Sequence, residues 1–354
     1  MLAKTEFTDQ KTGLTVQVLG KPGVDTSHQY FTAMSWMSDS RHMLLCTQID
    51  EEKKGKYIKT DIMDGRTEVI AERLDWGRGL VSQQDVFYYY DGPLIYEFNL
   101  ITCQTRTVCT LNPDETVYGP LSITNDGKKM GIYWRKGNDW TIGTLDITNG
   151  LVEKAASPGF AEPYPIANHA MINPAYPHLI FFSHEGQTEY IADRIYIIDT
   201  DSGIIKNAYP QKKLEGGELV EFVGHEMWSA DGDYLYFVKY PQSPLKPTGV
   251  HRIDKQSSEA SLINGDYNYW HVSLSPDGKW AVADTIEQEA ISKIVLIHLE
   301  NRTSRMLCEL PIWYQHPGHP HPSFSPDSRK ISFTFADEQA NLQVGIIDLD
   351  ECAL

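Results

Sequence analysis

One short unit recurs seven times along the chain: an apolar segment, a turn rich in Asp, Asn, Gly and Ser, and two further apolar runs separated by a polar loop. The clearest copies are HEMWSADGDYLYFVKY, HVSLSPDGKWAVADT and HPSFSPDSRKISFTF, which begin at His225, His271 and His321. Weaker copies begin at Thr32, Gly77, Tyr118 and His169. Short apolar runs between turn residues are typical of strands, and a repeat of about 40 to 55 residues matches the four-stranded blade of a propeller. The sequence therefore predicts an all-β fold, a seven-bladed β-propeller with antiparallel blades around a central channel.

The whole chain is expected to form this one domain, with blades beginning near residues 32, 77, 118, 169, 225, 271 and 319. A length of 354 residues, of which 41% are hydrophobic, suffices for one large core. An N-terminal strand is predicted from Leu14 to Leu19. We expect it to complete the last blade and close the ring, since closure removes two exposed sheet edges.

Composition narrows the class of protein. The N-terminus lacks the apolar segment of a secretion signal, no stretch is long and apolar enough to span a membrane, and five cysteines without CxxC spacing indicate reduced thiols. We therefore expect a cytoplasmic protein. A net charge of −17 argues against nucleic acid or an anionic membrane as partner, although a local cluster of His, Arg and metal can still bind a carboxylate. The oligomeric state stays open.

Three histidines share one register of the repeat, six residues before an aspartate that opens a turn: His225 before Asp231, His271 before Asp277, and His321 before Asp327. In a radially repeated fold, equal register means equal height on the ring, so these side chains should converge. His169 has nearly the same register in the fourth unit. The start of a blade's first strand, the end of its second strand and the start of its third strand lie on one face of the propeller. In the fourth unit, His184 and Glu185 end the second strand and Arg194 begins the third, so we expect them on the same face as these histidines.

The seventh unit carries a dense histidine segment, HPGHPHPSF, with His316, His319 and His321. His319 and His321 are two residues apart, so in an extended strand they face the same side, about 7 Å apart at ~3.3 Å per residue. The flanking prolines favour such an extended backbone. Neutral imidazoles suit a divalent transition metal, with Zn, Mn, Fe and Ni all acceptable by ligand type, and His271 of the neighbouring blade is a further ligand candidate.

A structural role is the alternative for each of these residues. One histidine at a blade start is more often a hydrogen-bonding group, but several imidazoles crowded at one pole would repel one another when protonated, which favours metal binding for the group. His169 and His184 remain open between the two roles. Glu226 is expected to point away from His225 and to pack between blades or face solvent. Structural or surface roles are expected for His28, His42, His178, His251 and His298.

The segments SHEGQTEYIADRIYIID, GHEMWSADGDYLYFV, WHVSLSPDGKW and HPGHPHPSFSPD resemble the corresponding blades of the oligogalacturonate lyases, cytoplasmic seven-bladed enzymes of pectin degradation. The similarity is collinear from about Tyr30 to the C-terminus. SPDG turns also occur in TolB-like and peptidase-associated propellers, whereas HPHPSF is not expected there.

The resemblance implies a β-elimination on a uronate oligosaccharide, assisted by Mn²⁺ or another divalent transition metal. Its metal-binding positions correspond to His271, His319, His321 and, in place of a family glutamine, His316. The general base corresponds to His225, and the substrate-binding arginine to Arg194. A base removes the weakly acidic C5 proton while a cation and a guanidinium stabilise the charge that develops on the carboxylate.

Other readings stay open beside this one. The substrate-binding set is expected to comprise Arg194, His184 and His169, but the loops at 136–141 and 285–292 look short for the family, so the uronate oligosaccharide can differ. A glycoside hydrolase is disfavoured because no pair of carboxylates is expected at this mouth. A non-catalytic TolB-like scaffold is the alternative function. A peptidase-associated propeller is disfavoured because no GxSxG motif is present.

Overall fold

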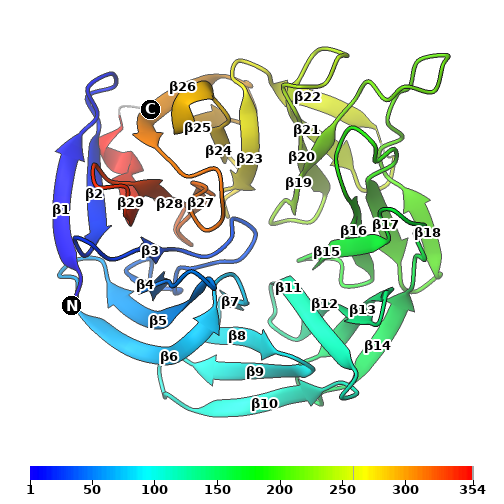
Figure 1. Ribbon diagram of the computed structural model, residues 1–354, viewed down its shortest axis with the longest axis horizontal. Helices are drawn as coiled ribbons and strands as arrows, with labels where there is room; N and C mark the ends of the chain where they lie inside the picture. Colours follow the sequence, from blue (N-terminus) through cyan, green and yellow to red (C-terminus); the bar gives the residue numbers. More distant parts are fainter. Residues whose placement is uncertain (258, 353–354) are drawn as a thin grey trace.

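The computed structural model describes residues 1–257 and 259–352, which form seven antiparallel β-sheets arranged as blades around a central channel (Figure 1). The predicted all-β, seven-bladed propeller is confirmed. In the described part of the chain the helical elements are two single 3₁₀ turns, η1 (Gln288–Ala290) and η2 (Leu349–Glu351). None of the helices there is long and apolar enough to cross a membrane.

The first four blades each consist of four consecutive strands, with the inner strand first in sequence. Blade 1 contains β3 (Thr26–Ser27), β4 (His42–Thr47), β5 (Lys54–Asp61) and β6 (Thr67–Asp75). Blade 2 contains β7 (Gly79–Val81), β8 (Val86–Asp91), β9 (Leu94–Asn99) and β10 (Thr105–Thr110). Blade 3 contains β11 (Glu115–Ile123), β12 (Lys129–Lys136), β13 (Asp139–Asp146) and β14 (Val152–Ala156). Blade 4 contains β15 (Ile166–Ile172), β16 (Leu179–Glu185), β17 (Ile195–Asp199) and β18 (Ile204–Asn207).

The next two blades follow the same rule, and the seventh combines both ends of the chain. Blade 5 contains β19 (Val223–Trp228), β20 (Tyr234–Lys239), β21 (Gly249–Asp254) and β22 (Ala260–Asn264). Blade 6 contains β23 (Tyr269–Leu274), β24 (Trp280–Thr285), β25 (Ile291–His298) and β26 (Ser304–Pro311). Blade 7 contains β27 (Ser323–Phe324), β28 (Lys330–Ala336), β29 (Leu342–Asp348), β2 (Thr15–Gly20) and β1 (Ala3–Thr8).

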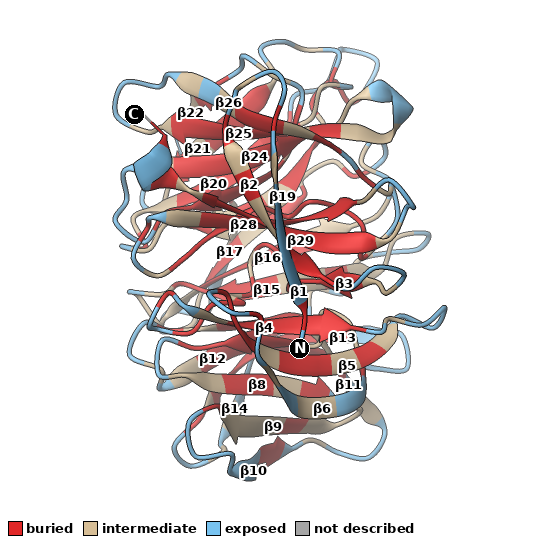
Figure 2. Ribbon diagram, turned by 90° about the vertical axis from the view of Figure 1, so that its left-hand side faces the viewer, coloured by how far each residue is buried: buried red, intermediate tan, exposed pale blue. Residues whose placement is uncertain are grey.

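The N-terminal strands complete the sheet that the C-terminal strands begin. β2 pairs antiparallel with β29, with Val18 opposite Gly345, and β1 pairs with β2 at the outer edge. Figure 2 shows β1 exposed at the surface, while β28 and β29 behind it are buried. Apolar side chains from adjacent blades pack together, as where Val16 joins Phe333 and Leu296. Burial between blades thus holds the ring together.

Three inner strands are interrupted by a β-bulge at the histidine register. The pairing register shifts between Asn168 and Met171 in β15, between Gly224 and Met227 in β19, and between Tyr269 and Val272 in β23. His169 and His225 lie in these bulges at positive φ, 51° and 56°. A bulge redirects side chains that regular alternation would send elsewhere, which here turns the imidazoles toward the channel.

The inner strand of blade 1 is split, unlike the continuous strand expected from Thr32. β3 pairs with the end of β4, and only an isolated bridge from Trp36 to Met43 continues it. The segment between them reaches into the middle of the ring (Figure 1). It buries Tyr30 and Phe31 to 9% and 2% exposure beneath the histidines. This segment therefore closes the channel and forms the floor of the mouth.

Candidate functional site

Three histidines from blades 6 and 7 form a buried cluster. His271 lies in β23, while His319 and His321 precede β27, and one ligand nitrogen from each of the three lies within 4.8 Å of the others. Their exposures are 1%, 7% and 0%. The expected extended strand over residues 319–321 does not form, because Pro320 and Pro322 lack the N–H groups that strand pairing requires, and His321 has a φ of +44°. The two rings converge all the same, with centroids 5.2 Å apart.

The surroundings of this cluster fix which imidazole nitrogens remain free. The Nδ1–H of His271 donates to both carboxylate oxygens of Asp284 at 2.9 Å, which leaves Nε2 without a partner. The Nε2–H of His319 donates to the carbonyl oxygen of Tyr314 at 3.0 Å, which leaves Nδ1 without a partner. Neither nitrogen of His321 has a partner. Buried nitrogens rarely stay unpaired, so the cluster is arranged for a group that accepts their lone pairs.

Burial also keeps these histidines neutral. It lowers the pKa of His271 well below the usual value, with a further contribution from His319, and it lowers the pKa of His321 in the same direction. Burial raises the pKa of Asp284 to about 7, while the backbone N–H of His271 acts in the opposite direction. His271 thus meets Asp284 as a neutral hydrogen-bond donor, which is the form of a histidine whose other nitrogen ligates a metal.

His316 lies beside the three histidines and is only half-buried. Its ring centroid lies 4.0 Å from that of His319 and 5.0 Å from that of His321, and its Nδ1 has no partner. Trp76 of the loop before blade 2 stacks on the same ring at 5.3 Å. Burial, followed by His319 and His271, lowers the pKa of His316 to about 2. His316 lies beside the cluster of His271, His319 and His321 but is not one of the three residues whose ligand nitrogens lie within 4.8 Å of one another.

His225 of β19 faces the cluster from blade 5. Its ring centroid lies 4.0 Å from that of His271, and its Nδ1–H donates to the carbonyl oxygen of Trp270 at 2.5 Å. The hydroxyl of Tyr240 lies 3.1 Å from the same Nδ1. Burial, with His271 and Arg194, lowers the pKa of His225 well below its usual value. A neutral His225 with Nδ1 occupied presents the Nε2 lone pair, as a general base requires.

Arg194 is buried between two glutamates rather than free at the mouth. Its Nη1 and Nη2 donate to the two carboxylate oxygens of Glu185 at 2.9 Å, and its Nε donates to Glu226 at 3.1 Å. Arg194 and Glu226 are 4% and 2% exposed. His225 contacts blade 6 whereas Glu226 contacts Ser183 of blade 4, so Glu226 is a blade-packing residue pointing away from His225, and not a solvated one. Two of the five guanidinium N–H groups of Arg194 remain available.

The two histidines of blade 4 whose role the sequence leaves undecided, His169 and His184, have different surroundings. His184 stacks on Phe160 with ring centroids 3.7 Å apart, and its Nε2–H donates to the carbonyl oxygen of Tyr164, so it is occupied by its own blade. His169 points to the channel floor, where its ring meets Tyr30 at 5.7 Å. Tyr30 also contacts His321, so His169 lies at the floor beneath the candidate metal-binding histidines, whereas the ring of His184 is held by Phe160 and Tyr164.

Several residues of the site escaped the sequence analysis. Asp284 is the second-last residue of β24 in blade 6, and Tyr240 directly follows β20 in blade 5. Glu185 ends the corresponding second strand of blade 4, so the topological rule that places Glu185 at this mouth also identifies Asp284 and Tyr240. Tyr30 and Phe31 carry no such signal. Phe31 nevertheless contacts His225, His271 and His321 by ring centroids 5.4 to 6.0 Å away.

The donor set fits a divalent transition metal. His271, His319 and His321 each offer an unpartnered nitrogen, and the other nitrogen of two of them is held by a carboxylate or a carbonyl oxygen. Such outer hydrogen bonds orient imidazole ligands and fix the tautomer in protein metal sites. Imidazole ligands suit Zn, Mn, Fe, Cu or Ni better than Ca²⁺ or Mg²⁺, which prefer oxygen.

Comparison with known proteins yields no matching family model. Two curated relatives align with most of the chain: an oligogalacturonide lyase of Pectobacterium atrosepticum (23% identity over 364 residues, 93% of this chain and 92% of the relative) and an oligogalacturonate lyase of Dickeya dadantii (22% over 365 residues, with the same coverage).

Solved structures give the same result for the fold. An oligogalacturonate lyase in complex with manganese superposes with a TM-score of 0.85 at 20% identity, covering 98% of this chain and 96% of the other. The oligogalacturonate lyase from Vibrio parahaemolyticus gives 0.83 at 18% identity, covering 99% and 97%. TolB from Acinetobacter baumannii gives only 0.51 at 12% identity, covering 87% and 77%. The match over nearly the whole chain, in sequence and in fold, confirms the resemblance of this protein to the oligogalacturonate lyase family.

Proposed function

We propose that this protein is a metal-dependent lyase that cleaves uronate-containing oligosaccharides, oligogalacturonate or a close relative, by β-elimination. The observation that carries the proposal is the set of unpartnered imidazole nitrogens on His271, His319 and His321, with His225 against one of these rings. A base beside a cation site is what removal of a proton next to a carboxylate requires. The similarity to oligogalacturonate lyases supports the same reaction class.

The metal would be held by His271, His319 and His321, with His316 at their side. Manganese is the first choice, since the related lyase was solved in complex with it. When bound, a divalent cation supplies Lewis-acid stabilisation to a substrate carboxylate, which makes the neighbouring C5–H more acidic. Asp284 and the carbonyl oxygen of Tyr314 keep the free nitrogens of His271 and His319 directed to one point.

His225 takes the C5 proton on Nε2 in this proposal. The C5–H electron pair forms the C4–C5 double bond, and the bond from C4 to the glycosidic oxygen breaks. The departing oxygen takes up the proton that the His225 imidazolium gives back through water, which leaves a free hydroxyl and a neutral His225. The bond from Nδ1 to the Trp270 carbonyl oxygen fixes the ring in the required tautomer and stabilises the imidazolium that forms. General base catalysis of this kind contributes about 10² to 10⁴ in rate.

Arg194 lies behind the backbone of His225 and affects the protonation of its imidazole. A Cβ placed on Gly224 would lie 3.3 Å from the Arg194 Nε, so the guanidinium lies directly behind the backbone that carries His225. Its charge helps to keep His225 neutral. Because Glu185 and Glu226 occupy three of its N–H groups, a contact with the substrate carboxylate uses the two that remain.

The scaffold alternative explains less of the molecule. A protein-interaction propeller has no use for buried nitrogens without hydrogen bonds, each of which costs about 1–3 kcal/mol when left unpaired. A hydrolase is also less well supported, because Glu185 and Glu226 at this mouth are both tied to Arg194 rather than free as an acid and a nucleophile.

The test is to incubate the purified protein with oligogalacturonates and follow the ultraviolet absorbance of the unsaturated product. We expect absorbance with Mn²⁺, loss of it with chelator, and recovery when Mn²⁺ is restored. His225→Gln should bind metal normally and lose about 10² to 10⁴ in kcat, whereas His319→Ala should lose metal. Absence of product from every uronate oligomer, together with failure to bind Mn²⁺ or Zn²⁺, would exclude the lyase.

A further inference from the structure

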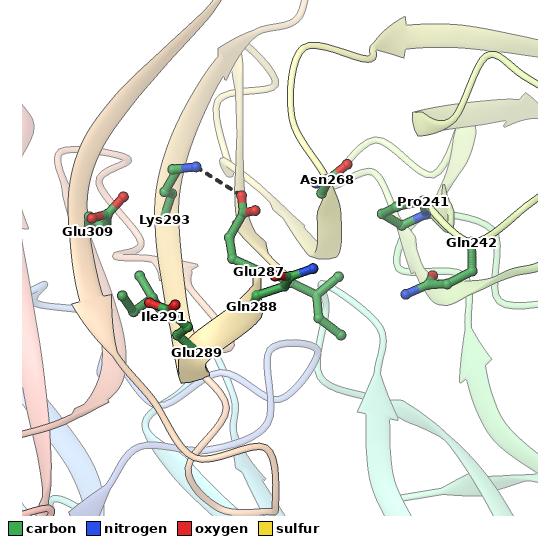
Figure 3. Close-up of a pocket in the computed structure, with 10 residues that line it drawn as sticks. Pro241, Gln242, Asn268, Glu287, Gln288, Glu289, Ile291, Lys293 and Glu309 are labelled. Atoms are coloured by element: carbon green, nitrogen blue, oxygen red, sulfur yellow. Dashed lines mark hydrogen bonds and ion pairs between the residues drawn. The ribbon is translucent and has the colours of Figure 1, made fainter.

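A pocket opens between blades 5 and 6, on the side of the ring that carries His225 and His271 (Figure 3). Its volume is about 720 Å³. Pro241 and Gln242 lie on one side, and Glu287 and Gln288 face them across the pocket. Its full lining is Pro241, Gln242, Asn268, Ile286, Glu287, Gln288, Glu289, Ile291, Lys293 and Glu309.

Both walls of this pocket are connected to the residues of the candidate site. Pro241 directly follows Tyr240, whose hydroxyl meets His225. On the other side, the hydroxyl of Tyr314 donates to the Glu287 carbonyl oxygen and accepts from the Ala290 N–H, while the carbonyl oxygen of Tyr314 accepts from His319. A sugar that is linked to a uronate at His225 and extends between blades 5 and 6 would therefore enter this pocket.

The charges of the lining do not suit a second carboxylate. Lys293, the only cation among the lining residues, forms an ion pair with Glu287 at 3.0 Å. Glu309 is paired with Lys11, and no ion pair of Glu289 occurs among the described residues. A uronate placed here would meet Glu289 with no free cation to offset the repulsion, as like charges at short range disfavour binding.

The remaining polar side chains suit hydroxyl groups. The side chains of Gln242, Asn268, Gln288 and Glu289 form no hydrogen bond with the protein in the described part of the chain, so their donors and acceptors are open to a ligand. Amide groups both donate and accept, which matches a sugar hydroxyl, and Glu289 accepts. Pro241, Ile286 and Ile291 add apolar surface for the carbon face of a ring.

We propose that this pocket is a neutral-sugar subsite, which receives a monosaccharide without a carboxylate that is glycosidically linked to the uronate at His225. The inference rests on the proposed lyase function and narrows its substrate to mixed oligosaccharides, in which uronates alternate with neutral sugars. Two observations support the subsite: the lining of the pocket is polar and has no unpaired cation, and both walls of the pocket are connected to residues of the candidate site.

The test compares two substrates of equal length with the Mn²⁺-loaded full-length protein: a homo-oligomer of galacturonate, and an oligomer in which galacturonate alternates with the neutral sugar rhamnose. We expect kcat/KM to favour the mixed oligomer by about tenfold or more, which corresponds to two hydrogen bonds. Gln242→Ala and Asn268→Ala should each reduce this preference by about fivefold, mainly through KM.

Glu289→Lys supplies an unpaired cation, because the lysine already in the lining, Lys293, is paired with Glu287. It should lower KM for the homo-oligomer and raise KM for the mixed oligomer, which shifts the preference toward the homo-oligomer. Glu153→Lys makes the same charge change on the exposed outer strand β14 and should leave both substrates unaffected. Equal kcat/KM for the two substrates in the wild type, or a preference that none of the pocket variants alters, would overturn the subsite.

Failure of the lyase function gives a different result. If neither oligomer is cleaved, the lyase proposal fails, and calorimetric binding of the two uncleaved oligomers decides the subsite. Tighter binding of the mixed oligomer, with the difference lost in Gln242→Ala, supports the subsite, whereas equal binding or no binding of the two rejects it.

Discussion

Asp284 supports the candidate metal centre more than any other residue outside the ligands. Its carboxylate accepts hydrogen bonds from the backbone N–H of His271 at 2.7 Å, from the His271 Nδ1–H at 2.9 Å, and from the backbone N–H of His321 at 3.2 Å. In Asp284→Asn one oxygen becomes an NH₂ group. That group would face an N–H donor, so at least one of these hydrogen bonds is lost and a ligand shifts.

The expected loss of metal affinity follows from the effect of hydrogen-bond partners on metal-binding histidines. Removing a hydrogen-bond partner of a metal-bound histidine typically costs 10- to 100-fold in metal affinity, about 1.4–2.8 kcal/mol. We expect the Kd of Mn²⁺ or Zn²⁺ to rise by that factor in Asp284→Asn, as measured by competition with a chelating dye.

The control removes a carboxylate of similar bonding but remote position. Asp199 accepts backbone N–H groups from Asp201 and Ser202 in the turn after β17, at the end of that strand away from the mouth. Asp199→Asn should leave the metal Kd unchanged. A Kd for Asp284→Asn within twofold of the wild type, in a protein that still unfolds cooperatively, would refute the role assigned to Asp284.

Three further predictions concern stability. Arg194→Ala leaves the fully buried Glu226 carboxylate unpaired and should lower the free energy of unfolding by about 3–5 kcal/mol in urea titrations, with part recovered when Glu226→Ala is added; an effect below 1 kcal/mol would contradict this. Burial opposes ionisation of Glu185, but the Arg194 charge lowers its pKa to about 2, so this group stabilises the fold above pH 4.5 and loses that effect as the pH falls toward 2. The stability difference between wild type and Glu185→Gln should therefore shrink over that range, and a difference independent of pH would argue against the pair. Phe31→Ala should cost about 3–5 kcal/mol by opening a cavity under the histidines, measured by chemical denaturation, and a neutral effect would show that the floor repacks.

The repeat made the fold predictable because each blade buries the same faces against its neighbours. Turn aspartates such as Asp231 and Asp277 mark the hairpin between the first two strands of a blade, so the position of each inner strand followed from the sequence. The histidine cluster was predictable for the same reason, since equal register places residues at equal height.

The repeat does not predict the places where the structure departs from regular blades. The bulge at His225 and the split inner strand before Trp36 interrupt regular strand pairing, and the alternation of apolar and polar residues does not encode them. Tyr30 and Phe31 fill the channel from a segment without periodicity. The pairing of Arg194 with Glu226 was missed because it joins two blades, and the sequence places each residue only within its own.

The central claim is that His225 and the histidine cluster carry out an elimination rather than a hydrolysis. Cleavage of oligogalacturonate and of the mixed oligomer in H₂¹⁸O, with Mn²⁺ present and products weighed by mass spectrometry, tests it most directly. The account predicts an unsaturated product with no ¹⁸O from the cleavage, lighter by one water than the hydrolytic product. Saturated products that carry one ¹⁸O would contradict it.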